Sequence, residues 1–174
     1  MNSLFLQDMS ENETALPGWE IERKFLVAET PPGLGRYPHE AIRQGYLALA
    51  EDGTEVRLRH KGDHFFQTIK QGGGLQRAEV EIELTRSQFD ALWPLTEGRR
   101  VEKVRYAIAH EGHTLELDVY AGALAGLITA EVEFPSVEAS AAFQTPSWLG
   151  VEITEDARYK NKNLAVYGVP PAGV

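Results

Sequence analysis

Two carboxylates and a lysine alternate in the segment EIERKFLV, residues 20–27. If this segment is a β-strand, Glu20, Glu22 and Lys24 share one face. The two carboxylates then lie about 7 Å apart, because a strand rises ~3.3 Å per residue and its side chains alternate. Like charges at this distance repel each other. The row therefore requires a compensating partner opposite it, either water or a more specific ligand.

Charges of one sign are also grouped in other alternating segments. Arginines share a face in VRLR (56–59), whereas acids share a face in EVEIEL (79–84) and in AEVEF (130–134). The ordinary interpretation of one such strand is a solvated sheet face. A solvated face gains from mixed signs, however, and like charges opposite each other cost stability. Since the pattern recurs on nearly every predicted strand, it favours charged faces that meet around a shared space.

Charged faces that converge would line a channel containing both acids and bases. The acids of this channel would be Glu20, Glu22, Glu79, Glu81, Glu83, Glu116, Asp118, Glu131, Glu133 and Glu152. The bases would be Lys24, Arg57, Arg59, Lys70, Lys103 and Arg105. Buried charges are tolerated when they are paired, hydrated or bound to a metal, so we expect a wet channel. Oxygen ligands favour Mg²⁺ or Mn²⁺. Guanidinium and ammonium groups match phosphate oxygens, so the whole set indicates a metal–polyphosphate complex.

The elements that would position these side chains are mostly strands. Period-two alternation predicts strands at 19–27, 42–49, 54–60, 64–70, 77–84, 101–109, 114–120, 129–134 and 149–154. Short turn sequences between them predict antiparallel hairpins. Helices are predicted at 85–95, with Ser87 as a possible N-cap, and at 136–144 and 155–167. The predicted fold class is α+β: an eight-stranded antiparallel closed β-barrel with a charged interior and a few covering helices.

Length and composition limit the alternatives. A chain of 174 residues fits one domain, with residues 1–18 as a flexible leader and 19–170 as the folded unit. The sequence has no cysteine, which excludes disulfides, thiolate catalysis and a cysteine zinc site and fits a cytoplasmic location. A net charge of −9 disfavours a nucleic-acid partner. No apolar run approaches the ~20 residues of a membrane helix, so no membrane partner is expected.

The charged segments, taken in order, resemble the CYTH superfamily, the triphosphate tunnel metalloenzymes. The matching blocks are EIERK, RQGYL (43–47), VRLR, TIK (68–70), GLQRAEVEIEL (74–84), VEKVRY (101–106), LELDVYAG (115–122), AEVEF and WLGVEITEDARYKN (148–161). The match spans residues 19–167 and is most similar to small bacterial members that hydrolyse inorganic tripolyphosphate. The resemblance implies a tunnel in which a divalent metal ion supports hydrolysis of a triphosphate to pyrophosphate and phosphate.

The resemblance also implies roles for individual residues. Catalytic positions match Glu20, Glu22 and Lys24. Substrate-binding positions match Lys24, Arg57, Arg59, Lys70, Lys103, Arg105 and Lys160. Metal-binding positions match Glu20, Glu22, Glu81, Asp118, Glu131 and Glu133. Lys160 would stand near a C-terminal helix that can plug the tunnel, and its alternative interpretation is a solvated charge on that helix. Tyr46 and Tyr120 are either packing residues or phenols that reach a phosphate.

Three other functions remain open. A class IV adenylyl cyclase and a thiamine or nucleoside triphosphatase would share the tunnel but need a stacking platform for the organic group. No clear cluster of aromatic residues serves this purpose, which favours inorganic triphosphate as the small-molecule substrate. A polyphosphate- or nucleotide-sensing module would bind without turnover, but the presence of both carboxylate pairs favours an enzyme. Apolar outward strand faces make a homodimer an expectation.

Overall fold

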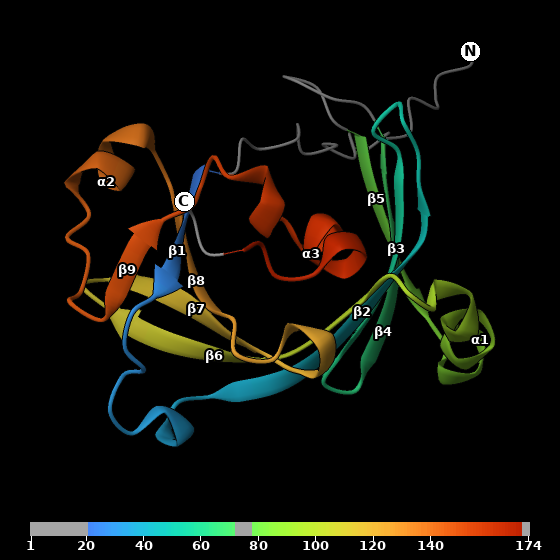
Figure 1. Cartoon of the computed structure of the whole chain (residues 1–174), viewed down its shortest axis with the longest axis horizontal. Coiled ribbons are helices and arrows are strands. Elements are labelled where there is room, and N and C mark those ends of the chain that lie inside the picture. Colours follow the sequence, from blue (N-terminus) through green and yellow to red (C-terminus); the bar gives the residue numbers. More distant parts are fainter. Residues whose placement is uncertain (1–20, 72–77, 172–174) are drawn as a thin grey trace, which may run out of the picture.

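The computed structural model describes residues 21–71 and 78–171 (Figure 1). Its strands are β1 (Ile21–Val27), β2 (His39–Leu49), β3 (Glu55–Lys61), β4 (His64–Gln71), β5 (Ala78–Leu84), β6 (Arg100–His110), β7 (His113–Tyr120), β8 (Ile128–Phe134) and β9 (Leu149–Glu152). Its α-helices are α1 (Arg86–Leu92), α2 (Val137–Ala142) and α3 (Asn161–Tyr167). Its 3-10 helices are η1 (Leu34–Arg36), η2 (Trp93–Thr96), η3 (Gly122–Leu124) and η4 (Ala157–Tyr159).

All nine strands form one antiparallel sheet in the order β5-β4-β3-β2-β6-β7-β8-β1-β9. The sheet is strongly curved, so that β3, β4 and β5 face β1 and β8 across a space that contains α3 (Figure 1). Within the described residues, the sheet is not closed by hydrogen bonds between its ends, β5 and β9. The expected closed eight-stranded barrel is therefore not confirmed. The coarser expectation, an antiparallel sheet with a few helices, is confirmed.

A ninth strand explains part of this difference. β1 pairs with β8 along one edge and with β9 at Phe25–Val27 along the other. A strand has only two edges for ladder hydrogen bonds, so this part of β1 has no edge left for β5. The segment 149–154 was predicted as a strand, but alternation along one segment carries no information about which neighbour it pairs with.

Two apolar clusters lie on the convex side of the sheet, on the faces opposite the charged residues. Leu117 and Val132 belong to a cluster that also contains Phe143, next to α2. Leu58 packs with Phe89 of α1 in a second cluster. Alternation places these apolar residues and the charged residues of the same strands on opposite faces. The convex face is therefore stabilised by helices, and the concave face remains for polar side chains.

A third cluster fills part of the concave side. Leu164 of α3 packs there with Val101 and Tyr120, which come from the concave faces of β6 and β7. This packing holds α3 against the concave face of the sheet, between the two ends of the sheet (Figure 1). The predicted helix at 155–167 is thus divided into η4 and α3.

Most predicted element boundaries agree with the structure. β2 begins at His39, earlier than the predicted residue 42, and β9 ends at Glu152 instead of 154. The N-cap of α1 is Thr85, not Ser87: the Thr85 hydroxyl accepts a hydrogen bond from the Gln88 backbone in a capping box. No helix among the described residues is long and apolar enough to cross a membrane. The predicted leader, residues 1–18, lies outside the described residues.

Candidate active site

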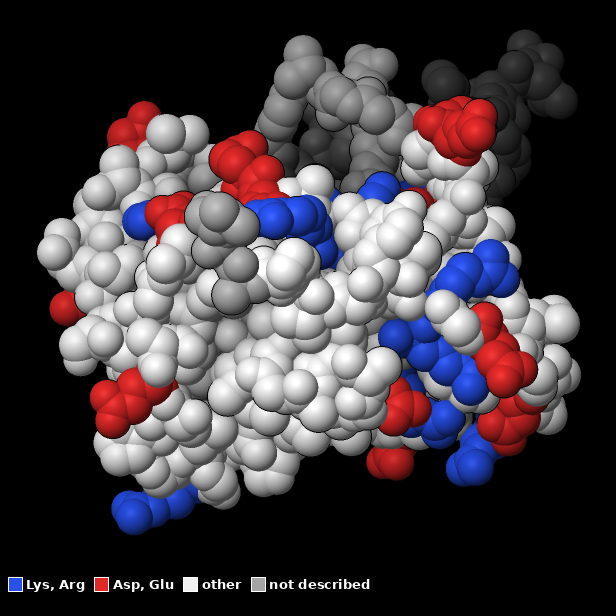
Figure 2. All heavy atoms as spheres, viewed as in Figure 1, with Lys and Arg blue, Asp and Glu red and all other residues white. Residues whose placement is uncertain are grey.

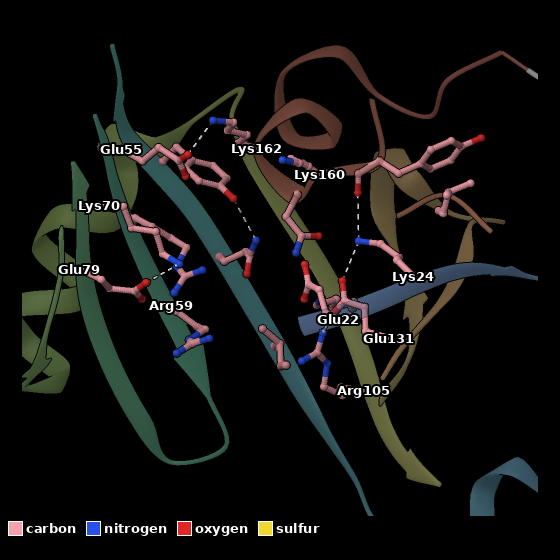
Figure 3. Close-up of a pocket in the computed structure, with 18 of the residues that line it drawn as sticks. Glu22, Lys24, Glu55, Arg59, Lys70, Glu79, Arg105, Glu131, Lys160 and Lys162 are labelled. Atoms are coloured by element: carbon pink, nitrogen blue, oxygen red, sulfur yellow. Dashed lines mark hydrogen bonds and ion pairs between the residues drawn. The ribbon is translucent and has the colours of Figure 1, made fainter. Parts of the chain in front are cut away.

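The concave face of the sheet forms a cleft of about 490 Å³. All seven predicted substrate-binding residues line it: Lys24, Arg57, Arg59, Lys70, Lys103, Arg105 and Lys160. Of the predicted acids, Glu81 also lines it, as do Glu22, Glu79 and Glu131, which are labelled in Figure 3. Figure 2 shows that charged side chains are unevenly spread over the visible face of the molecule, with wide areas that carry neither sign. The structure therefore brings basic residues from four strands, β1, β3, β4 and β6, and from the C-terminal segment into one space.

Some predicted channel acids do not line the cleft. Glu133, Glu83 and Glu152 are exposed and are not among its lining residues. Glu152 instead pairs with Arg23 on the other face of β1, with 2.7 Å between Arg23 Nη2 and Glu152 Oε2. Glu20 lies outside the described residues. Alternation correctly predicts a face, but it does not show how far along that face the cleft extends.

One charge cluster is formed by β1, β6, β7 and β8. Lys24 and Glu131 are directly opposite each other in the β1–β8 ladder, and Lys24 Nζ lies 2.8 Å from Glu131 Oε1. Arg105 Nη2 donates to Glu131 Oε2 at 2.9 Å (Figure 3). Behind them, Asp118 is fully buried and accepts hydrogen bonds from Lys103 and Arg105. Arg105 also pairs with Glu116.

These contacts shift the ionisation of the cluster. Burial alone would raise the pKa of the Glu131 carboxyl, but Lys24, Lys103 and Arg105 outweigh it and lower that pKa to about 2. Burial lowers the pKa of the Lys103 ammonium despite its pairing with Asp118. Burial would also lower the pKa of Arg105, but hydrogen bonding to Asp118 and the surrounding acids raise it above its usual value. Glu131 and Arg105 are thus held in their charged forms.

A second cluster is formed by β3, β4 and β5. Glu81 accepts hydrogen bonds from Arg59 Nη2 at 3.0 Å and from the buried Thr68 hydroxyl at 2.7 Å. Arg57 Nη2 donates to the same hydroxyl at 3.1 Å. Lys70 pairs with Glu79 at 2.8 Å (Figure 3). This side of the cleft therefore presents two guanidinium groups and one ammonium group with fewer acids around them.

Two guanidinium nitrogens in this cluster are incompletely satisfied. Nε of Arg57 and Nε of Arg59 are buried, and neither has a hydrogen-bond partner among the residues that the structure describes. Burial and the neighbouring Arg59 lower the pKa of Arg57. A buried N–H without an acceptor is costly. An anion in the cleft would supply acceptors, and phosphate oxygens fit guanidinium groups well.

The C-terminal segment contributes residues that sequence analysis missed. Lys162 Nζ pairs with Glu55 Oε1 at 2.7 Å, which connects α3 to β3 (Figure 3). The Tyr120 hydroxyl donates to Asn161 Oδ1 at 3.1 Å, so Tyr120 anchors α3 and is not a lining residue. Glu55 could have been found because it shares a strand face with Arg57. Nothing in the alternation points to Lys162, since it lies on a helix.

Tyr46 also lines the cleft, almost fully buried, and receives a hydrogen bond from Gln44 Nε2 at 3.3 Å. Tyr46 and Tyr159 are the aromatic residues among the described lining residues. They come from separate elements, β2 and η4, and two tyrosines offer a small aromatic surface for stacking a nucleobase or a thiazole ring.

The metal-site prediction can be compared with the described acids. Glu22 and Glu133 are directly opposite in the β1–β8 ladder, a position in which like charges destabilise each other unless a cation compensates them. No group of three or more described His, Asp or Glu residues is already arranged as a metal site. Glu20, the third acid of the predicted row, lies outside the described residues. An oxygen-only donor set of this kind fits Mg²⁺ or Mn²⁺.

The fold and the cleft define a class of antiparallel β-proteins whose concave, charged sheet face serves as the binding site for a polyanion. The CYTH domain model matches residues 19–166, and the chain belongs to this family. A relative from Nitrosomonas europaea named inorganic triphosphatase is 54% identical over 149 residues, covering 84% of this chain and 97% of that protein. A relative of the same name from Acetivibrio thermocellus is 37% identical over 150 residues, covering 84% and 93%.

Solved structures agree with this assignment. The crystal structure of the inorganic triphosphatase NE1496 is 49% identical, covers 86% of this chain and 95% of that chain, and superposes with a TM-score of 0.73. A putative adenylate cyclase from Bacillus halodurans is 21% identical, covers 79% and 97%, and has a TM-score of 0.51. At that identity the second match shows a common fold only.

Proposed function

We propose that this chain is a metal-dependent inorganic triphosphatase, which hydrolyses tripolyphosphate to pyrophosphate and phosphate in the cleft. The observation that carries the proposal is the pair of buried Nε atoms of Arg57 and Arg59, which have no acceptor among the described residues. Both arginines line a space that is also lined by further cations. Two relatives named inorganic triphosphatase support the choice of substrate. The small aromatic surface among the described lining residues, two tyrosines, supports an inorganic chain over an organic triphosphate.

In the proposed mechanism the two clusters hold the triphosphate from opposite sides. Arg57, Arg59 and Lys70 would bind phosphate oxygens from the β3–β4 side, and Lys24, Lys103 and Arg105 would bind them from the β1–β6 side. Lys160 would add a cation at the C-terminal segment. A chain with several negative charges can satisfy both sides at once, which a single phosphate is too short to do. Contacts on both sides fix the terminal phosphorus for in-line attack.

The carboxylates would hold the metal. We propose Glu20, Glu22, Glu131 and Glu133 as the residues that bind Mg²⁺ or Mn²⁺, with Glu81 as a further acid on the opposite side. When bound, the ion neutralises charge on the phosphate oxygens and lowers the pKa of a bound water. Water attacks a terminal phosphorus, the bond from that phosphorus to the bridging oxygen breaks, and pyrophosphate leaves with its electron pair. We assign Glu22, which lines the cleft, to accept the proton that the attacking water loses.

Closure of the cleft into a tunnel belongs to the same proposal. Strands close to the open ends of the sheet, β4 and β1, carry cations that would bind one ligand, so ligand binding favours the approach of the two ends. A homodimer is supported by Ile69, Val80 and Ile82, apolar residues exposed on β4 and β5. Light scattering of the purified chain, where twice the monomer mass is expected, tests the dimer.

The function is tested by phosphate release from tripolyphosphate, ATP and thiamine triphosphate, each with Mg²⁺, Mn²⁺ and a chelator. We expect turnover of tripolyphosphate with a divalent ion, none with the chelator, and a loss of about 100-fold or more in kcat for Glu22→Gln. Glu102→Gln is the matched control, because Glu102 is an exposed residue of β6 that pairs with Arg43 outside the cleft.

Two results would contradict the proposal. Cyclic AMP and pyrophosphate as the preferred products from ATP would identify a cyclase. Tight binding of tripolyphosphate without turnover under any metal would identify a sensor. Near-normal, metal-dependent hydrolysis by Glu22→Gln would remove Glu22 from the catalytic set while leaving the activity itself in place.

A further inference from the structure

Asp118 lies behind the cleft rather than in it. Its side chain is fully buried, it is not a lining residue, and it stands directly opposite Arg105 in the β6–β7 ladder. Its Oδ1 accepts from Arg105 Nε at 2.7 Å. Its Oδ2 accepts from Arg105 Nη2 at 2.7 Å and from Lys103 Nζ at 2.5 Å. Both carboxylate oxygens are therefore occupied by cations that belong to the cleft lining.

This geometry restricts the guanidinium of Arg105 strongly. The bidentate contact with Asp118 fixes the plane of the group from behind, because a fork of parallel N–H bonds to one carboxylate permits little rotation. Its remaining contacts run to Glu131, which lines the cleft, and to Glu116. Lys103, with a flexible four-carbon stem, is held by the same carboxylate. Asp118 thus determines where two cations of the lining point.

A metal-binding role fits this environment poorly. A metal ion would have to replace Lys103 and Arg105 at the same two oxygens, and it would leave both cations buried without their partner. Glu22 and Glu131, in contrast, are lining residues of the cleft, where the ligand would bind. The resemblance to the family placed Asp118 with the metal-binding acids, and the contacts in this chain point elsewhere.

We propose that Asp118 is a positioning residue that aims Lys103 and Arg105 at the phosphate chain and that it does not bind the metal. The proposal rests on the proposed triphosphatase function. It predicts a separation of two quantities: loss of Asp118 weakens binding of the phosphate chain even without metal, and the metal concentration needed for activity stays the same. If Asp118 were a metal ligand, its loss would instead leave metal-free binding of the phosphate chain unchanged and raise the metal concentration needed for activity.

The test compares Asp118→Asn with the wild type. Asparagine keeps the shape but removes the charge and one acceptor, so its amide cannot hold both cations. We expect the Kd of metal-free tripolyphosphate, measured by calorimetry in a chelator, to rise about 10- to 100-fold, as for loss of charged hydrogen bonds. We expect KM for tripolyphosphate to rise likewise, and the Mg²⁺ concentration for half-maximal activity to stay within about twofold. Glu102→Gln is expected to change none of these quantities.

A second variant keeps the test decisive if Asp118→Asn does not fold with two cations unpaired. Asp118→Asn combined with Lys103→Gln removes one of these cations, and Lys103→Gln alone is its reference. We expect the double variant to bind metal-free tripolyphosphate more weakly than Lys103→Gln, because Arg105 has lost its anchor. Equal affinities would overturn the proposal, as would a raised Mg²⁺ requirement with unchanged metal-free affinity. A wild type that neither binds nor hydrolyses tripolyphosphate would overturn the proposed function as well, which distinguishes the two failures.

Discussion

Glu131 connects the charges of the cleft to the stability of the fold. It pairs with Lys24 and Arg105, and these cations together with Lys103 hold its pKa at about 2 against the effect of burial. In the unfolded chain this carboxyl has an ordinary pKa of about 4.3. A carboxyl whose pKa is lowered by folding stabilises the folded state above its unfolded pKa, and this stabilisation is lost as the pH falls towards the folded pKa.

We therefore expect the free energy of unfolding to fall between about pH 4.5 and pH 2 more steeply in the wild type than in Glu131→Gln. The difference integrated over this window is on the order of 3 kcal/mol. Urea unfolding at a series of pH values measures it. Glu102→Gln is a control, since Glu102 is exposed on β6 and is not a lining residue of the cleft. Parallel pH profiles for the wild type and Glu131→Gln would contradict the assignment.

For individual residues, the sequence predicted which cations line the cleft better than it predicted which acids do. Every predicted substrate-binding residue lines the cleft, and for the six that lie on strands the reason is that alternation fixes the face to which a side chain belongs. Alternation says nothing about depth or about partners. Asp118 and Glu131 lie on the polar faces of neighbouring strands. Asp118 is nevertheless fully buried beneath two cations, whereas Glu131 lines the cleft. This distinction depends on contacts across the sheet that a single segment does not encode.

The elements show where local signals suffice and where they do not. The strands agree with prediction because each has its own alternating pattern between turn residues. The arrangement of the sheet was not predictable in the same way, since pairing of β9 with β1 joins segments more than a hundred residues apart. The start of α1 was misplaced because Thr85 and Ser87 are both good caps, and only Thr85 has a glutamine three residues later.

The capping box of α1 gives a prediction for this element. Thr85→Ala removes the acceptor for the Gln88 backbone N–H and is expected to lower the free energy of unfolding by about 1 kcal/mol. Ser87→Ala, the matched control, removes no cap and is expected to change it by less than about 0.5 kcal/mol. Chemical denaturation of both variants measures the difference. If Ser87→Ala were the more destabilising change, the N-cap assignment would be wrong.

For the whole molecule, the arrangement of cations around an open sheet matters most. The cations of the cleft come from β3 and β4 near one end of the sheet and from β1 near the other, and no ladder joins these ends within the part of the chain that the structure describes. A ligand that contacts both sides adds a connection that the backbone lacks. Ligand binding should therefore stabilise the molecule as a whole, in addition to its effect on any one strand.

We expect tripolyphosphate in a chelator, where it is not hydrolysed, to stabilise the folded state by about 2.7 kcal/mol at about 100 times its metal-free Kd. For a chain of this length that corresponds to a rise in Tm of about 5–10 °C. Orthophosphate at the same concentration is expected to give a much smaller rise, because it contacts one side only. Scanning calorimetry measures both. The double variant Arg57→Gln/Arg59→Gln should lose most of the shift, and an equal shift with orthophosphate would show that bridging plays no part.

The apolar clusters around Leu58 and Leu117 lie on the side of the sheet that faces away from the ligand. Selection for a new ligand can therefore act on every second residue of a strand while the interleaved residues preserve the packing. Such a scaffold can change its chemistry by small steps, none of which has to pass through a poorly folded intermediate.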